Sequence, residues 1–314
     1  MKKILVLFIT KIYGLLPFKF RFIFNYLLSK TFKNLPNNFC SEIPFLDKNI
    51  KICNIDHSFF SFQLYCNGAE FNEPETIIHL PDLLKDKKYF IDIGSNIGQY
   101  AIYASSVSED LKIHCFEPNQ QVFKFLNQNV HNNQLQNQIN IHQMAISSKK
   151  GIAELSITNS LMSSSLNPNW RQKLRTESVN IICLDSFCSE NNINDKTLIK
   201  IDVEGFEEEV LKGAKKFIIE NKPDIIIEIL SDIDPSINDF LKQNDYHFYH
   251  ITIDGFKEKE NIIKGQSTGE KYLFMNYLFS TKNKEDLNKI FESNKSKLNR
   301  FSPAKIYKET ILCD

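Results

Sequence analysis

The pattern of apolar and polar positions predicts strands that alternate with helices from about residue 88 onward. Short apolar runs typical of buried strands lie at residues 88–94, 111–118, 139–147, 197–205 and 224–230. Segments with apolar residues at helical spacing follow them at 98–107, 119–133, 206–222 and 234–245, with a further helix at 184–193. This alternation predicts an α/β fold, a doubly wound, Rossmann-like and mostly parallel sheet with helices on both faces.

Two regions interrupt or end this rhythm. Residues 151–183 read as an insertion, with short β segments at 152–158 and 178–183 around a loop rich in Ser and Asn. The last two strands, 246–252 and 271–281, have no obvious helix between them, which predicts an antiparallel end to the sheet. We therefore divide the chain into an N-terminal extension (1–75), a main domain (76–282) and a C-terminal helix with a tail (283–314).

The N-terminal extension begins with apolar runs separated by basic residues, and no acid precedes Glu42. The first apolar run, 4–10, is too short to span a bilayer, and no small-residue cleavage site follows it. Residues 1–30 allow two interpretations: a segment lying on the inner membrane surface, or a helix that packs on the domain or on a second subunit in a homodimer. The packing interpretation is favoured because amphipathic helices usually face a core.

Charge and cysteine content exclude some classes of protein. The chain has 314 residues, with 38 Lys plus Arg and 38 Asp plus Glu, so no net charge would attract nucleic acid. The seven cysteines are scattered without CxxC spacing. They are better explained as buried thiols in a reducing compartment than as disulfides or zinc ligands, which predicts a cytoplasmic protein.

The turn after the first strand of the main domain carries the candidate chemistry. The sequence from Asp92 to Gly98 reads D-x-G-x-N-x-G, and ligands of open α/β sheets bind beyond the carboxyl ends of the strands. Neither GxGxxG nor GxxxxGK[ST] is present, and an acid at this position disfavours phosphate and favours a cation. S-adenosylmethionine, with its amino group and sulfonium, fits this turn.

The end of the second strand supports the same ligand. Glu117 follows an apolar run, where an acid can accept hydrogen bonds from both ribose hydroxyls. Nicotinamide dehydrogenases share this feature, but the acidic first turn favours the methyl donor over NAD. The alternatives are an N-cap or turn role for Asp92 and a surface position for Glu117.

Several segments, in this order, resemble the FkbM-type methyltransferases over about residues 75–280. They are FIDIGSNIGQYA, CFEPN, MAISSKKGIAEL, LDSF, LIKIDVEGFEEEVLKGA and DIIIEI. These are class I enzymes that depend on S-adenosylmethionine. The resemblance implies a seven-stranded sheet with an antiparallel last strand. It also implies methyl transfer to a hydroxyl, on a sugar, glycan or glycolipid precursor of polysaccharide biosynthesis.

The resemblance also implies which residues hold the cofactor. Glu117 would bind the ribose, Ala145 would lie near the adenine, and Asp202 would lie beside the methyl group. The serines 163–165 and Leu166 would lie near the mouth of the site. The full cofactor set that it implies is Asp92, Gly94, Ser95, Asn96, Gly98, Glu117, Pro118, Ala145 and Asp202.

The catalytic base is harder to assign, because the family pattern ends the fifth strand with Glu-x-His. Here the sequence is Glu228-Ile229-Leu230, without the histidine. Asp202, Glu204 and Glu228 are the remaining candidates, either as a general base or as ligands of Mg²⁺ or Mn²⁺. The alternatives are structural: Asp202 and Glu204 would stabilise the start of the following helix, and Glu228 would be an exposed acid at a strand end. Trp170 and Arg171 in the insertion would contact a sugar or anchor the loop.

Other functions remain open from the sequence. One is a non-catalytic, cofactor-binding scaffold in glycan assembly, which the missing histidine allows. Another is a methyltransferase that acts on a lipid-linked or peptide acceptor. Nicotinamide-dependent oxidoreduction is disfavoured by the acidic turn.

Overall fold

The fold is described from a computed structural model. It describes residues 40–46, 48–53, 64, 69, 73–158, 164–168, 173–230, 232–262, 267–268, 271–272 and 276–298. The interpretations of residues 1–30, Ser163, Trp170 and Arg171 lie outside these residues. Among the described residues, no helix is long and apolar enough to cross a membrane.

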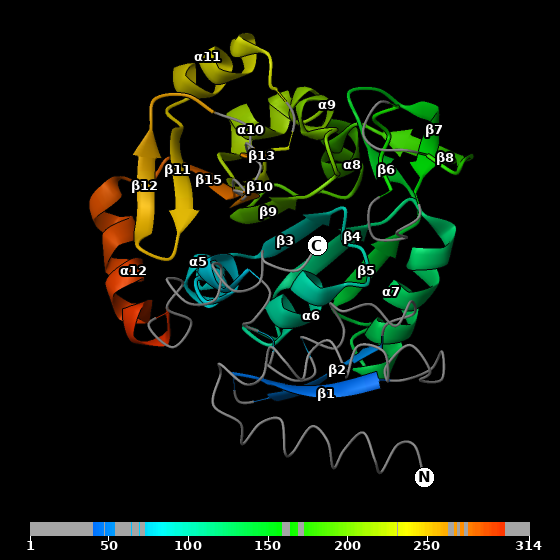
Figure 1. The fold of residues 1–314 in the computed structure, drawn as a ribbon, viewed down its shortest axis with the longest axis horizontal. Helices are drawn as coiled ribbons and strands as arrows, with labels where there is room; N and C mark the ends of the chain where they lie inside the picture. Colours follow the sequence, from blue (N-terminus) through cyan, green and yellow to red (C-terminus); the bar gives the residue numbers. More distant parts are fainter. Residues whose placement is uncertain are drawn as a thin grey trace.

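A twisted central sheet organises the molecule (Figure 1). Within the described residues it has eight strands in the order β12-β11-β15-β10-β9-β3-β4-β5. Their bounds are β3 Tyr89–Ile93, β4 Lys112–Phe116, β5 Ile139–His142, β9 Thr197–Ile201, β10 Asp224–Glu228, β11 His247–Thr252, β12 Gly255–Lys259 and β15 Asn276–Ser280.

The strand directions confirm the predicted doubly wound, mostly parallel sheet with an antiparallel strand near its end. β3, β4, β5, β9 and β10 pair in parallel, and β15 runs antiparallel to both of its neighbours. The eighth strand, β12, was not predicted. It forms because the chain turns back tightly between Thr252 and Gly255, and Gly255 has a φ of 110°.

Helices cover both faces of the sheet, because alternate strand residues point to opposite sides. Phe90 and Ile113 face a core formed with α5 (Leu80–Leu84), α6 (Gln99–Ser105), α7 (Gln120–Asn132) and α12 (Lys284–Leu298). Ile91 and Ile93 face a second core, formed with α8 (Leu184–Glu190), α9 (Glu207–Lys212), α10 (Lys215–Asn221) and α11 (Pro235–Gln243). The short helix α4 (Pro74–Ile77) precedes α5.

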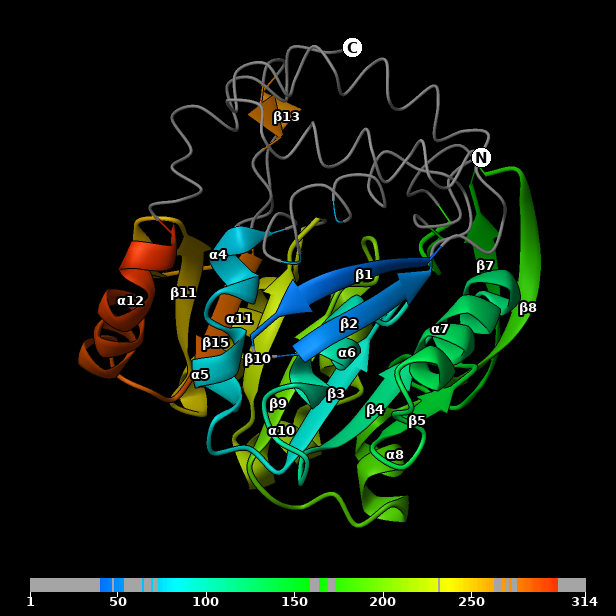
Figure 2. The same cartoon turned by 90° about the horizontal axis from the view of Figure 1, so that it is seen from below.

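A hairpin of β1 (Cys40–Phe45) and β2 (Lys48–Cys53) lies across α6 and α7 (Figure 2). The Asn129 side chain joins it to the domain: its Oδ1 accepts from the Cys53 N–H at 2.7 Å, and its Nδ2 donates to the Cys53 and Ile97 carbonyls. Cys40 and Cys53 form a disulfide, so the prediction of thiols is wrong for this pair. The antiparallel register, which the sequence does not reveal, places them directly opposite each other. Cys115 and Cys188 are free and buried, as predicted.

Three predicted elements are interrupted. The third strand, 139–147, is divided into β5 and β6 (Ala145–Ile146), and β6 joins the predicted insertion strands β7 (Gly151–Ile157) and β8 (Arg175–Ile182) in a separate sheet. The helix 206–222 breaks between α9 and α10 at Gly213, where a Cβ would lie 2.0 Å from the Ser147 carbonyl oxygen. Among the described residues, the final predicted strand is represented by β15 and by β14 (Lys271–Tyr272), which pairs separately with β13 (Ser267–Thr268).

Candidate functional site

The turn between β3 and α6 brings the chain against the end of β9. Gly94 and Gly98 have φ values of 81° and 85°, which glycine adopts without strain. A Cβ on Gly94 would lie 1.8 Å from the Asp202 carbonyl oxygen, and the Asp202 N–H donates to the Ile93 carbonyl at 3.0 Å. The D-x-G-x-N-x-G turn and Asp202 are therefore one rigid unit at the carboxyl edge of the sheet.

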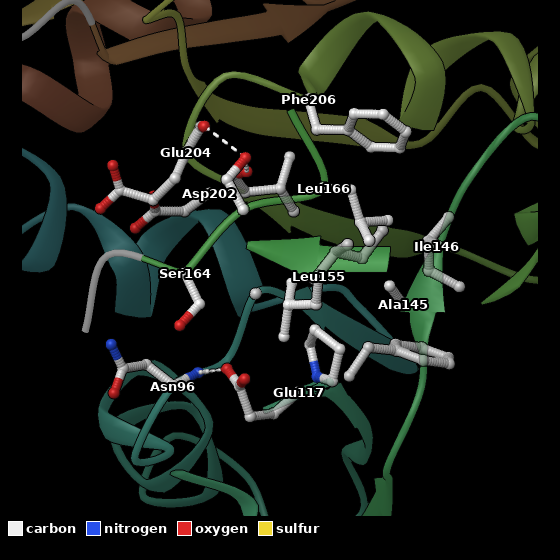
Figure 3. A pocket seen from close by; sticks show the side chains of 16 residues that line it. Asn96, Glu117, Ala145, Ile146, Leu155, Ser164, Leu166, Asp202, Glu204 and Phe206 are labelled. Carbon is white, nitrogen blue, oxygen red and sulfur yellow. Dashed lines mark hydrogen bonds between the residues drawn. The ribbon is translucent and has the colours of Figure 1, made fainter. Parts of the chain in front are cut away.

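A pocket lies at this edge, between the ends of β3, β4 and β9 and the β6–β8 sheet (Figure 3). It collects most of the residues that the sequence predicted for the cofactor. Its lining comprises Ile93, Gly94, Asn96, Phe116, Glu117, Pro118, Ala145, Ile146, Leu155, Ser164, Ser165, Leu166, Asp202, Val203, Glu204 and Phe206. The predicted residues Asp92, Ser95, Gly98 and Glu228 are not in this lining.

Glu117 is fixed between two backbone donors. Its Oε2 accepts from the Asn96 N–H at 3.0 Å (Figure 3), and its Oε1 accepts from the Asn119 N–H at 2.8 Å. Burial raises the pKa of Glu117 to about 7, although both hydrogen bonds oppose this shift. The carboxyl group is therefore held in one orientation, facing the pocket.

Asp92 lies buried behind the lining, with 1% of its surface exposed. Within the described residues, neither of its carboxylate oxygens makes a hydrogen bond of good geometry, although the Ala101 N–H lies near enough to lower its pKa, and the Asn96 Oδ1 also has no partner. Burial raises the pKa of Asp92 to about 7, while the charge of Lys200 opposes the shift. Buried polar atoms without partners are uncommon in native proteins, so these oxygens indicate a ligand that donates hydrogen bonds.

Asp202 and Glu228 share the acidic side of the site. Asp202 Oδ2 accepts from Lys200 Nζ at 2.9 Å, and Asp202 also hydrogen-bonds with Glu228. Burial and the neighbouring Asp202 charge raise the pKa of Glu228 well above its ordinary value. Glu228 therefore stays protonated at neutral pH and donates its proton to the hydrogen bond with Asp202.

The predicted divalent cation has no support in the described residues. They contain no group of three His, Cys, Asp or Glu side chains placed to hold a metal ion. Asp202 and Glu228 contact each other, but Asp202 already forms an ion pair with Lys200.

The short segment 164–166, which the family resemblance placed at the mouth, forms one wall of the pocket. Ser165 Oγ donates to the Glu204 carbonyl at 2.7 Å, and Asn119 Nδ2 donates to Ser164 Oγ at 2.9 Å. These bonds connect the insertion to the ends of β9 and β4.

Sequence reasoning missed three contributors to the site. Lys200 had a usable signal, since it lies two residues before Asp202 in a strand and therefore on the same face. Phe206 lines the pocket directly after the predicted Glu204–Gly205 turn. Glu73 had no local signal, because its partners Tyr100 and Asn276 come from distant segments.

Comparison with known proteins identifies the family. Residues 92–248, half of the chain, match the model of the methyltransferase FkbM domain. The chain belongs to the FkbM methyltransferase domain family. The matched segment begins at Asp92, the first acid of the site, and ends inside β11.

Two kinds of relative accompany this FkbM match. The hexuronic acid methyltransferase AglP of Haloferax volcanii is 29% identical over 147 residues, which cover 46% of this chain and 56% of the relative. The chain thus spans about half the length of that curated relative. An FkbM methyltransferase of Methylobacillus flagellatus aligns at a TM-score of 0.43 and 16% identity, over 71% of this chain and 54% of that one. An S-adenosylmethionine-dependent methyltransferase of Agrobacterium tumefaciens aligns at a TM-score of 0.41 and 8% identity. This alignment covers 79% of this chain and 71% of that one.

Proposed function

We propose that the protein transfers a methyl group from S-adenosylmethionine to a hydroxyl group of a sugar, glycan or glycolipid precursor. The observation that carries the proposal is the pairing of Glu117, oriented by two backbone N–H groups, with the unpartnered Asp92 carboxylate. A ribose diol donates hydrogen bonds to the first, and the cationic amino acid end of the cofactor suits the second.

The remaining lining suits the rest of this cofactor. The apolar wall formed by Ala145, Ile146 and Phe206 matches an adenine ring. Gly94 lines the pocket, and its lack of a side chain lets the turn lie directly against the Asp202 carbonyl.

The reaction needs alignment and a proton acceptor. Bound S-adenosylmethionine supplies a methyl group that its sulfonium already activates, and the sulfur leaves with the bonding electrons as a neutral thioether. Asp202 accepts the proton that the acceptor hydroxyl loses as its oxygen bonds to the methyl carbon. Glu228 is protonated and cannot be that base, which leaves Asp202 and Glu204 of the three predicted acids.

The sugar acceptor is supported by the name of a relative, the hexuronic acid methyltransferase, and it agrees with what the resemblance to the family implies. Lipid-linked and peptide acceptors are alternatives within the same chemistry.

Calorimetric titration with S-adenosylmethionine and S-adenosylhomocysteine tests the proposal. We expect micromolar binding, equivalent to about 8 kcal/mol, that is lost in Glu117→Ala and in Asp92→Asn. Glu109→Ala is the matched control, because Glu109 is 92% exposed and lies in the loop before β4, at the opposite edge of the sheet. Absence of binding by the folded wild-type protein would overturn the proposal.

A further inference from the structure

A buried polar network lies beside the pocket and extends outside the family-matched segment. Lys200 occupies its centre: the Lys200 side chain is only 6% exposed, and its Nζ lies 2.9 Å from Asp202 Oδ2. The same Nζ lies 4.5 Å from the centroid of the Tyr100 ring. A cation over an aromatic face, bound to a carboxylate on its other side, has little freedom to move.

Glu73 closes this network from the other side. It accepts from the Tyr100 hydroxyl at 2.7 Å and from the Asn276 side-chain amide at 3.0 Å. Asn276 lies opposite Glu228 in the pairing of β15 with β10. Glu73 and Asn276 both fall outside residues 92–248, the segment that the family model matches.

The charges in the network are balanced around Lys200. Burial alone would lower the pKa of Lys200, but the carboxylates of Asp202, Glu73 and Asp92 raise it, so it stays charged. Removing one partner from a buried charge network leaves an uncompensated charge, and the pKa values of the remaining groups shift as a result.

We propose that Lys200 and Glu73 are positioning residues of the methyl-transfer site: Lys200 holds Asp202 as an oriented carboxylate, and Glu73 holds Lys200 through Tyr100 and its own charge. Neither residue lines the pocket. The inference rests on the proposed function, since it deepens the role given there to Asp202.

The test compares S-adenosylmethionine with S-adenosylhomocysteine, because the first carries a sulfonium charge and the second does not. The ratio of their dissociation constants depends on the negative charge near the sulfur. Contacts that the two ligands share contribute equally to both constants and cancel in the ratio. Four titratable groups face the Lys200–Asp202 pair: Asp92 from β3, Tyr100 from α6, Glu228 from β10 and Glu73 before α4. The ratio of dissociation constants is therefore measured as a function of pH in each variant.

Opposite shifts are expected from the two positioning residues. Lys200→Met should move the midpoint of the pH profile upward by about 1–3 pH units, because Asp202 loses its counter-charge. Glu73→Gln, which keeps an acceptor for the Tyr100 hydroxyl, should move it downward. In an Asp202→Asn background the Lys200→Met shift should become smaller, since only the effect of the Lys200 charge on Asp92 remains. Lys88→Met is the control, as Lys88 pairs with Asp195 at 3.0 Å on an exposed surface.

The outcomes separate the two proposals. If wild-type protein binds neither ligand, the proposed function itself fails. If it binds both but the variants keep the wild-type ratio and midpoint, only the positioning proposal is overturned, even where a variant is less stable. If Lys200→Met does not fold, Glu73→Gln alone tests the positioning proposal. A downward shift of the midpoint of its pH profile supports the proposal, and an unchanged midpoint overturns it.

Discussion

At the scale of single residues, the two glutamates at the strand ends are both buried yet serve different purposes. Glu117 has two backbone donors and faces the pocket, so its carboxylate form can be used by a ligand. Glu228 lies outside the lining next to a negative charge, so its proton is retained. The same residue type is thus a ligand-binding anion in one place and a neutral donor in the other.

The raised pKa of Glu117 predicts a pH-dependent affinity for S-adenosylhomocysteine. The folded, ligand-free protein binds a proton at this carboxyl below about pH 7, and ribose binding favours the ionised form. At pH 6 about nine-tenths of a group with this pKa is protonated, so affinity should rise up to about tenfold between pH 6 and pH 8. Calorimetry in Glu117→Gln should show weaker binding with a smaller slope, because only Asp92 then still titrates near pH 7.

Glu109→Gln serves as the control and should keep the slope, because Glu109 is exposed and distant from the pocket. If Glu117→Gln keeps the wild-type slope, the prediction is contradicted. The pH dependence of the affinity would then come from Asp92, the other carboxyl whose pKa burial raises to about 7.

At the scale of elements, the strand ends were predictable because their chemistry is local. Asp92, Gly94 and Asn96 follow one apolar run, and Glu117 follows the next, so sequence order alone placed them at one edge of the sheet. The break of the helix at Gly213 was not predictable. It depends on the close approach of the Ser147 carbonyl, which comes from a segment far away in the sequence.

Contact between the first turn and β9 gives a stability prediction. Gly94→Ala should destabilise the protein by more than about 3 kcal/mol, since it combines a left-handed φ with backbone overlap at Asp202. Gly151→Ala is the matched control: Gly151 also has a positive φ, but nothing lies within 4 Å of its added Cβ. Urea unfolding of both variants separates backbone strain from overlap. Equal losses in the two variants would mean that the turn and the end of β9 can move apart.

At the scale of the whole molecule, the sequence predicted the layers better than the connections between distant segments. Period-two and helical patterns are enough to place strands and helices. By contrast, Glu73 joins Tyr100 and Asn276 across more than half of the chain, and the Cys40–Cys53 pair depends on hairpin register. These contacts depend on how the elements pack, and no local pattern carries that information.

Asp224 provides a further long-range connection, at the amino end of β10. It binds Lys87 Nζ at 2.7 Å, and Lys282 and Ser280 also bind it, so it joins the chain before β3 to the end of β15. Asp224 is 3% exposed and Lys87 is 10% exposed. Removing the carboxylate should therefore leave the largely buried Lys87 without its counter-charge and beside the more exposed Lys282.

We expect Asp224→Asn to lower the free energy of unfolding by about 3 kcal/mol at neutral pH. Burial would raise the pKa of Asp224, but Lys87 and Lys282 outweigh it, so the pKa lies below the ordinary aspartate value of 3.8. The contribution is thus fully present above pH 3.8 and declines as the pH falls through the lower folded value. The difference between wild type and variant should stay constant from neutral pH down to mildly acidic pH, and shrink only in stronger acid. Asp195→Asn, which removes an exposed pair with Lys88, should cost much less. Urea unfolding at several pH values would measure this, and a difference already shrinking near neutrality would show that water reaches the cluster.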